Sequence, residues 1–301
     1  MSDPDLDSGL SATTQTLVLD HADGKLQTAD GESVYFQLWR PKDPRGVLLF
    51  VHGLAEHSGR YGYPIEYFTR RGWICAALDL RGHGRSSGKR VHVERFADYV
   101  ADVRLVRERL VTKLPDLPLF QVGHSMGGLI TLLDALDAPV ELTGAVVSSP
   151  ALGVPAEAEP GFLLALIARV LNRIAPRVLL PGIEPGAISR DPQVVQAYLD
   201  DPLVSRRVTP RWLAAIRQAM EEAHQRAASL SLDLLVMQSG DDTLVDPQSA
   251  ERWARAAPDD RITWKLWPGL YHEMFNEPER AEVLGFLEQW LQDQLGETTS
   301  G

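Results

Sequence analysis

The sequence predicts an α/β protein in which a mostly parallel central sheet carries helices on both faces and a helical segment interrupts the alternation. Short, continuous apolar stretches recur along the 301 residues, and amphipathic stretches separate them. Strands of a parallel sheet are buried on both faces, so they read as continuous apolar runs. The strand pattern is missing between residues 154 and 225, where helix signals replace it.

The expected strands begin at residue 34. Val34 to Trp39 alternates between apolar and polar residues, as a half-buried strand does. Apolar strands follow at 46–51, 73–78, 119–122, 144–147 and 234–237, and a further strand is expected at 261–267. The last helix is expected to start near Pro278, and its apolar face consists of Val283, Leu284, Phe286, Leu287, Trp290 and Leu291.

The interrupting segment is predicted to be a helical cap. A helix from Gly161 to Ala175 must end before Pro176. Asp191-Pro192 and Thr209-Pro210 each combine an N-cap residue with a proline at the first helical position. Open α/β sheets bind ligands at the carboxyl ends of their strands, where we expect the cap to lie. The predicted division is an acidic, partly disordered segment (1–30), a core (31–153 and 226–301) and a cap (154–225).

Composition excludes several classes of function. With 30 basic and 41 acidic residues, the net charge is −11. This charge argues against nucleic-acid binding and against purely electrostatic binding to anionic lipid. The single cysteine, Cys75, lies in an apolar run and is expected in the core, which fits a reducing, cytoplasmic location. Neither a signal-peptide pattern nor an apolar stretch approaching about 20 residues is present, so no transmembrane segment is expected.

Ser125 is the candidate nucleophile. It lies in Gly123-His124-Ser125-Met126-Gly127, a Gly-x-Ser-x-Gly pattern that directly follows an apolar strand and directly precedes an apolar helix. A nucleophile elbow needs this strand, sharp turn and helix. A second match at 84–88, around Ser86, has no helix after it and is interpreted as a loop.

A serine nucleophile needs a base and an acid, which on such sheets follow in the order Ser, Asp or Glu, His. His272 comes after the strand that ends at Trp267, whereas the other histidine beyond Ser125, His224, falls in the cap. Asp241 and Asp242 terminate the strand before it, and Asp246 is close. Position alone leaves the choice of acid open.

Two backbone amides are expected to stabilise the oxyanion that forms during the reaction. One is the N–H of Met126, which follows the nucleophile. The other belongs to the loop after the 46–51 strand, where we expect the N–H of Leu54. His52 in this loop is expected to brace it.

These segments together resemble the monoacylglycerol lipase family of α/β-hydrolases. The resemblance covers residues 34 to 292. The most specific block is HGLAEHSGRY at 52–61. The other blocks are DLRGHGRS (79–86), GHSMGG (123–128), ISR (188–190), YLDDPL (198–203), LVD (244–246) and YHE (271–273).

The resemblance implies an α/β-hydrolase fold and selects Asp242 as the acid. It also implies that the alcohol end of the substrate is held by Glu56, Arg60, His124 and Tyr198. For Glu56 and Arg60, an ion pair that stabilises the loop is an equal alternative. Asp79, Arg81 and His83 are expected to be structural. The sequence departs from the family by carrying Leu54 where a small residue is usual, which changes the pocket and not the backbone donor.

The predicted activity is a serine hydrolase that cleaves monoacylglycerols to fatty acid and glycerol through an acyl-enzyme on Ser125. The alternatives are a lysophospholipase or broad-specificity carboxylesterase with the same triad, and an inactive binding module. We expect no cofactor and no metal, because no ligand spacing such as His-Glu-x-x-His is present.

The helix predicted at 161–175 has two possible roles. Phe162, Leu163, Leu166, Ile167, Val170 and Ile174 can share a face, and Arg169, Arg173 and Arg177 recur every four residues. This pattern is typical of an ordinary amphipathic helix, or of one whose apolar side touches lipid or the acyl chain.

Overall fold

A computed structural model describes residues 20–137, 139, 141–158, 162–182 and 184–296. Its centre is an eight-stranded sheet in the order β1-β2-β4-β3-β5-β6-β9-β10. The pairs β1–β2 and β2–β4 are antiparallel and all other pairs are parallel. The strands are β1 (Asp20–Gln27), β2 (Ser33–Arg40), β3 (Gly46–Val51), β4 (Trp73–Asp79), β5 (Leu119–His124), β6 (Gly144–Ser148), β9 (Leu234–Ser239) and β10 (Ile262–Trp267).

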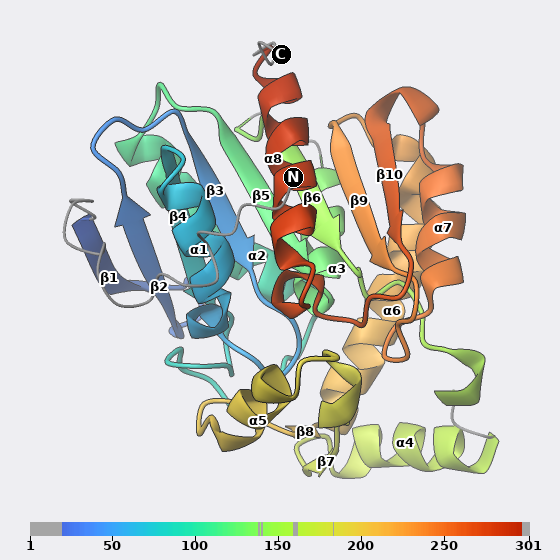
Figure 1. Cartoon of the computed structure of the whole chain (residues 1–301). Coiled ribbons are helices and arrows are strands. Elements are labelled where there is room, and N and C mark those ends of the chain that lie inside the picture. The colour runs from blue at the N-terminus through green and yellow to red at the C-terminus, as the bar shows by residue number, and fades with distance from the viewer. Residues whose placement is uncertain (1–19, 138, 140, 159–161, 183, 297–301) are drawn as a thin grey trace.

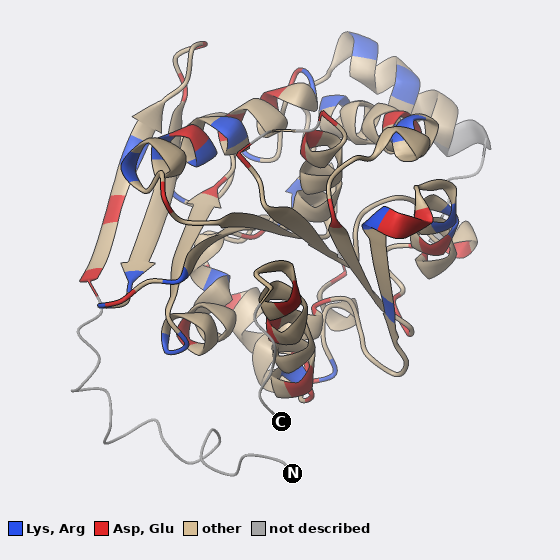
Figure 2. Cartoon of the chain, turned by 90° about the horizontal axis from the view of Figure 1, so that it is seen from above, with Lys and Arg blue, Asp and Glu red and all other residues tan. Residues whose placement is uncertain are grey.

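Helices cover both faces of this sheet (Figures 1 and 2). Helices α1 (Gly62–Thr69) and α8 (Arg280–Gln294) pack into one apolar cluster with one face of the strands. Helices α2 (Ala97–Lys113), α3 (Met126–Ala135) and α7 (Pro247–Ala256) share the cluster on the opposite face. The strands between these layers are continuous apolar runs because both of their faces are buried. Cys75 in β4 is fully buried, as predicted.

The strand order reverses at β3. The chain runs from β3 outward to β4, and then returns to place β5 on the other side of β3. Open α/β sheets bind ligands beside the loops at the carboxyl ends of the two strands where the order reverses, here β3 and β5. The segments that contain Leu54 and Ser125 are these two loops.

The inserted segment contains α4 (Phe162–Ile174), α5 (Pro192–Asp200) and α6 (Pro210–Arg226), which lie beyond the carboxyl ends of the strands (Figure 1). The predicted helix N-cap residues are confirmed. The Asp191 side chain accepts a hydrogen bond from the N–H of Gln193, and the Thr209 side chain accepts one from the N–H of Trp212. The segment also contains one short strand pair, β7 (Leu180–Pro181) and β8 (Arg207–Val208), which its sequence does not predict.

The sequence pattern also fails to predict strand β1. Its residues pair with β2 from Asp20 opposite Arg40 to Gln27 opposite Ser33. Most of its side chains are exposed, so it lacks the alternation of a half-buried strand. Part of the segment predicted as a separate acidic region is therefore the edge of the sheet. The first dozen residues, predicted to be disordered, lie outside the described residues.

Candidate active site

Ser125 occupies the sharp turn between β5 and α3. Its φ of 54° and ψ of −117° lie where non-glycine residues are rare, and such strain costs about 1–3 kcal/mol. The N–H of Ser125 donates to the carbonyl of Ser148 (2.9 Å), and its carbonyl accepts from the N–H of Ala151 (3.0 Å). These backbone bonds hold the turn, so the serine is presented at the N-terminus of α3.

The glycines on either side of Ser125 are required by close backbone approach. A Cβ on Gly127 would lie 2.1 Å from the carbonyl oxygen of Val51 and 2.5 Å from that of His52. A Cβ on Gly123 would lie 2.3 Å from the carbonyl oxygen of Gly127. Helix α3 therefore starts directly against the loop after β3, which brings Ser125 beside the loop of the predicted oxyanion donor.

His272 and Asp242 form a buried pair at the ends of neighbouring strands. His272 Nδ1 donates to Asp242 Oδ2 over 2.7 Å, and Asp242 Oδ1 accepts from the N–H groups of Leu244 and Val245 at 2.9 and 3.1 Å. The His272 ring lies 4.7 Å, centroid to centroid, from that of His124, which precedes the nucleophile. Since Nδ1 is held by Asp242, Nε2 is the nitrogen left for proton transfer.

The charges of this pair stabilise each other. Burial would raise the pKa of Asp242, but the attraction of His272 and two backbone N–H donors lower it. Burial would lower the pKa of His272, but the charge and hydrogen bond of Asp242 outweigh burial and raise it. Glu273 and Glu56 act on the His272 pKa in the same direction as Asp242. The site is therefore suited to holding a proton on this imidazole.

Side chains on both sides hold the loop after β3, which is the predicted oxyanion loop. His52 Nδ1 donates to the carbonyl of Gly53 (2.7 Å) and its Nε2 accepts from the N–H of Leu80 (2.9 Å). The carboxylate of Glu56 accepts from the N–H of Gly53 (2.6 Å). A trans peptide is planar, so the N–H of Leu54 points away from the Gly53 carbonyl that His52 holds. His52 thus braces the loop, as predicted.

The nucleophile turn packs against this loop. A Cβ on Gly53 would lie 3.1 Å from the Ser125 Cβ. Met126 is the first residue of α3, and no side chain caps this helix end. The first amides of a helix have no partner within it, so the N–H of Met126 is suited to an oxyanion.

The residues implied to hold an alcohol group form one buried cluster. Glu56 accepts from Arg60 Nη1 (2.7 Å) and from the Tyr61 hydroxyl (3.0 Å), so the ion pair considered as an alternative is present. The guanidinium of Arg60 lies 4.8 Å from the ring of Tyr198 in α5, whose buried hydroxyl has no hydrogen-bond partner within the described part of the chain. Burial lowers the pKa of His124 to about 4, so this histidine is neutral at pH 7.

Glu273 is a further member of the cluster that the sequence analysis did not identify. Both of its carboxylate oxygens accept from Arg60, at 2.6 and 2.7 Å. The amide of Asn276 donates to the same carboxylate over 2.9 Å. Its position next to His272 is the one signal in the sequence, and nothing there indicates Arg60 as its partner.

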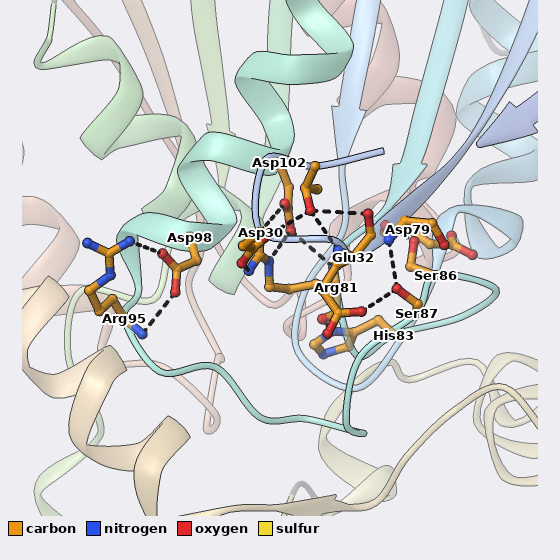
Figure 3. A network of polar contacts seen from close by, with 12 residues as sticks. Asp30, Glu32, Asp79, Arg81, His83, Ser86, Ser87, Arg95, Asp98 and Asp102 are labelled. Carbon is orange, nitrogen blue, oxygen red and sulfur yellow. Dashed lines mark hydrogen bonds and ion pairs between the residues drawn. The ribbon is translucent and has the colours of Figure 1, made fainter. Parts of the chain in front are cut away.

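Asp79, Arg81 and His83 have structural contacts, as expected. Arg81 donates to Asp30 (2.6 Å) and, through two nitrogens, to the buried Asp102 (2.7 and 2.8 Å), as Figure 3 shows. Asp79 accepts backbone N–H bonds from Ser58 in the segment after β3 (2.8 Å) and from Arg85 in the loop after β4 (2.7 Å). His83 Nδ1 donates to the carbonyl of Arg81 (3.0 Å). This network fixes the loop after β4.

The other candidates of the sequence analysis have different partners. The Ser86 hydroxyl donates to a backbone carbonyl at 2.5 Å within the loop after β4, and His224 Nε2 donates to the carbonyl of Leu152 (2.9 Å). Asp246 caps α7, and Asp241 is exposed. Of the three aspartates that position left open, the structure places Asp242 against His272.

Comparison with known proteins agrees with this geometry. A family model described as serine aminopeptidase, S33, matches residues 42–279. A monoacylglycerol lipase from Mycolicibacterium smegmatis is 37% identical over 267 residues, which cover 88% of this chain and 95% of that protein. The chain belongs to the monoacylglycerol lipase family of α/β-hydrolases.

Other members of the monoacylglycerol lipase family and its neighbours are similar over nearly their whole length. The crystal structure of a monoacylglycerol lipase from Paleococcus ferrophilus matches with a TM-score of 0.75 and 31% identity, covering 91% of this chain and 99% of that one. A phospholipase from Bacillus subtilis is 34% identical and covers 84% of this chain and 99% of that protein. The predicted fold and family are confirmed, and the chain is a hydrolase.

Proposed function

We propose that this protein cleaves the ester bond of monoacylglycerols, releasing a fatty acid and glycerol. The observation that carries the proposal is the Asp242–His272 pair beside the strained turn that presents Ser125. The substrate class is supported by relatives named as monoacylglycerol lipases that align over 95% and 99% of their lengths.

We infer a two-step acyl transfer. His272 Nε2 takes the proton of the Ser125 hydroxyl as the oxygen attacks the ester carbonyl. The N–H groups of Leu54 and Met126 stabilise the resulting oxyanion, and each such donor is worth about 3 kcal/mol. The imidazolium, held by Asp242, gives its proton to the departing glycerol oxygen. Water then attacks the acyl-enzyme by the same steps and releases the acid.

The polar end of the substrate is proposed to lie against Glu56, Arg60, His124 and Tyr198. Glu56 and Arg60 already satisfy each other, so their main contribution is to shape this side of the site. The free hydroxyl of Tyr198 and the neutral ring of His124 remain for hydrogen bonds with the alcohol. Tyr198→Phe is then expected to affect glycerol esters more than simple alkyl esters.

The acyl chain is proposed to lie under α6. A cavity of about 310 Å³ is lined mainly by apolar side chains of α6 and of the loop after β6, including Leu152, Val154, Trp212, Ile216 and Met220. The N–H of Ala151, next to the lining residue Leu152, bonds to the carbonyl of Ser125, so this edge of the cavity adjoins the loop that holds the Ser125 turn. Mostly apolar cavities of about this size are typical of small-molecule sites.

A transient contact between α4 and a lipid surface is also proposed. Leu166, Ile167, Val170 and Ile174 are 44 to 73% exposed on this helix, and the side chains of Phe162 and Leu163 lie outside the description. An exposed apolar face with arginines beside it suits the membrane interface. Within the described ranges, no helix has the length and apolarity needed to cross a membrane. We further propose a cytoplasmic location, which the single, buried Cys75 supports.

Lysophospholipids are a second candidate substrate class. A relative named as a phospholipase aligns over 99% of its length at 34% identity. A lysophospholipid has one acyl chain, like a monoacylglycerol, but it places a phosphate diester where the latter has a free hydroxyl. The two classes therefore differ at the polar end of the site and not at the acyl cavity.

Hydrolysis rates of monoacylglycerols of graded chain length, measured beside lysophosphatidylcholine and p-nitrophenyl esters, test the proposal. We expect the highest kcat/KM for a monoacylglycerol. The Ser125→Ala variant should hydrolyse none of these substrates and should no longer be labelled covalently by a fluorophosphonate. Preference for acetyl over octanoyl esters would reject the lipid assignment. Faster hydrolysis of lysophosphatidylcholine would favour the second candidate.

A further inference from the structure

The Arg60 guanidinium is buried between two carboxylates. Its Nη1 donates to Glu56 at 2.7 Å, and Nη1 and Nη2 together bind Glu273 at 2.6 and 2.7 Å. The three side chains are 9%, 5% and 6% exposed, respectively. Paired, planar contacts of this kind fix direction as well as distance.

The two ends of this network belong to the two loops that carry the proposed chemistry. Glu56 holds the N–H of Gly53, which precedes the expected oxyanion donor Leu54. Glu273 directly follows His272, and its own N–H donates to the carbonyl of Ile188 in the inserted segment over 2.8 Å. The network therefore sets the position of the oxyanion loop, the histidine loop and the cap relative to one another.

We propose that Glu273 is a positioning residue: through Arg60 it holds the His272 loop against the oxyanion loop, and its charge stabilises the imidazolium that forms on His272. This inference rests on the proposed serine hydrolase mechanism. It does not depend on which ester is the substrate.

The charge balance supports an electrostatic part of this role. One arginine between two glutamates leaves 1 − 2 = −1 in a buried site, where charges act strongly because solvent does not screen them. The titratable groups that face His272 are Asp242, His124, Glu56 and Glu273. Burial lowers the pKa of His272, and Asp242 first, then Glu273 and Glu56, raise it.

Stability alone is a poor reason for this arrangement. Replacing a buried ion pair by apolar residues of similar volume is often neutral or stabilising, because desolvation of the charges offsets their attraction. A network that only had to join two loops could therefore be apolar. The neighbouring imidazole, which must carry a positive charge during the reaction, gives the buried negative charge a function.

Glu273→Gln tests the proposal, with p-nitrophenyl butyrate as a soluble substrate and Glu66→Gln as the matched control. Glu66 also pairs with an arginine, Arg70, but at the surface. Because misplacement of a catalytic group by about 1 Å can cost 10²-fold in rate, we expect kcat of Glu273→Gln to fall about 10- to 100-fold with little change in KM. The acid limb of its pH–rate profile should move to lower pH, since His272 loses a negative neighbour. The control should match wild type in both respects.

Glu273→Asp separates the two parts of the role and provides a test if Glu273→Gln does not fold. It keeps the charge but shortens the reach, so kcat should fall while the acid limb stays near that of wild type. An unchanged kcat and pH profile in folded Glu273→Gln would overturn the proposal, as would a rise in KM alone. If wild type cleaves the butyrate ester but no monoacylglycerol, the substrate assignment fails and this test still stands.

Discussion

Asp241, Asp242 and Asp246 lie close together in the chain, and the partners of each carboxylate decide its role. Asp242 binds His272 and two backbone N–H groups, whereas Asp246 caps α7 and Asp241 faces solvent. A base needs an acid that fixes its tautomer and orientation. At the scale of the residue, this geometry supports the proposal that Asp242 is the acid.

Asp242→Asn should therefore lower kcat by about 10⁴-fold, the loss seen when the acid of a serine triad becomes an amide. Asp241→Asn is the matched control and should retain the activity of wild type. Steady-state kinetics with a p-nitrophenyl ester measure both. Equal losses in the two variants would contradict the assignment.

His52 is a second residue whose contacts predict a kinetic effect. It holds the Gly53 carbonyl and so directs the N–H of Leu54. His52→Ala should lower kcat by about 10²-fold, comparable to losing one oxyanion donor, and leave KM nearly unchanged.

His52→Asn should recover part of that loss, because its Nδ2 can replace Nδ1 as the donor to the Gly53 carbonyl. Circular dichroism should show that all three proteins are folded. A rise in KM without a fall in kcat would contradict a role in the transition state.

At the scale of the element, helices α3 and α8 give opposite predictions for the same substitution. Gly127→Ala places a Cβ 2.1 Å from the Val51 carbonyl and should destabilise the protein by about 3 kcal/mol or more. Outside the backbone of its own helix, the nearest atom to such a Cβ on Gly285 in α8 is the Tyr67 hydroxyl oxygen at 3.8 Å, so Gly285→Ala should stabilise the protein by about 0.5–1 kcal/mol. Urea unfolding measures both, and a loss of stability in Gly285→Ala would be the contrary result.

Helix α4 should control attachment to lipid. The double variant Ile167→Glu, Ile174→Glu removes two exposed apolar side chains, each worth about 1.5–3 kcal/mol on full burial, and should weaken binding to phosphatidylcholine vesicles about tenfold or more. Leu266→Glu is the control, since Leu266 is 43% exposed on β10 and Ile167 is 44% exposed. Vesicle flotation tests this, and equal binding by the two proteins would reject α4 as the contact.

At the scale of the whole molecule, buried histidines make stability depend on pH. Burial is the main cause that lowers the pKa values of four histidines. It lowers the pKa of His83 to about 3 and that of His124 to about 4, and it also lowers the pKa values of His52 and His92. In the unfolded chain each histidine titrates near 6.5, so below this pH the unfolded state takes up protons that the folded state refuses. His272, with its raised pKa, acts in the opposite direction.

The melting temperature should therefore fall between about pH 6.5 and pH 4, since each unit of pKa difference is worth about 1.4 kcal/mol. Thermal unfolding monitored by circular dichroism across this range measures the effect. A His83→Asn variant should show a smaller dependence on pH. A melting temperature that is constant or rises on acidification would contradict the prediction.

Local patterns predicted much of this molecule. The apolar run of β3, the Gly-x-Ser-x-Gly turn and the proline-marked starts of α5 and α6 depend on residues adjacent in the chain. The pairs Arg60–Glu273 and His57–Asp201 join residues 213 and 144 positions apart. The spacing of apolar residues along the chain does not indicate such contacts, because they depend on the order of the strands in the sheet. The sequence therefore indicated the chemistry but not the network that orients it.

Strand β1 has a consequence for how the molecule meets copies of itself. It is the edge of the sheet, and Asp20, Asp23 and Lys25 are exposed along it. Charged side chains on an edge strand discourage pairing with a strand of a second molecule, because those charges would lose water on contact. The polar side chains that make β1 hard to recognise in the sequence thus also disfavour aggregation through this edge.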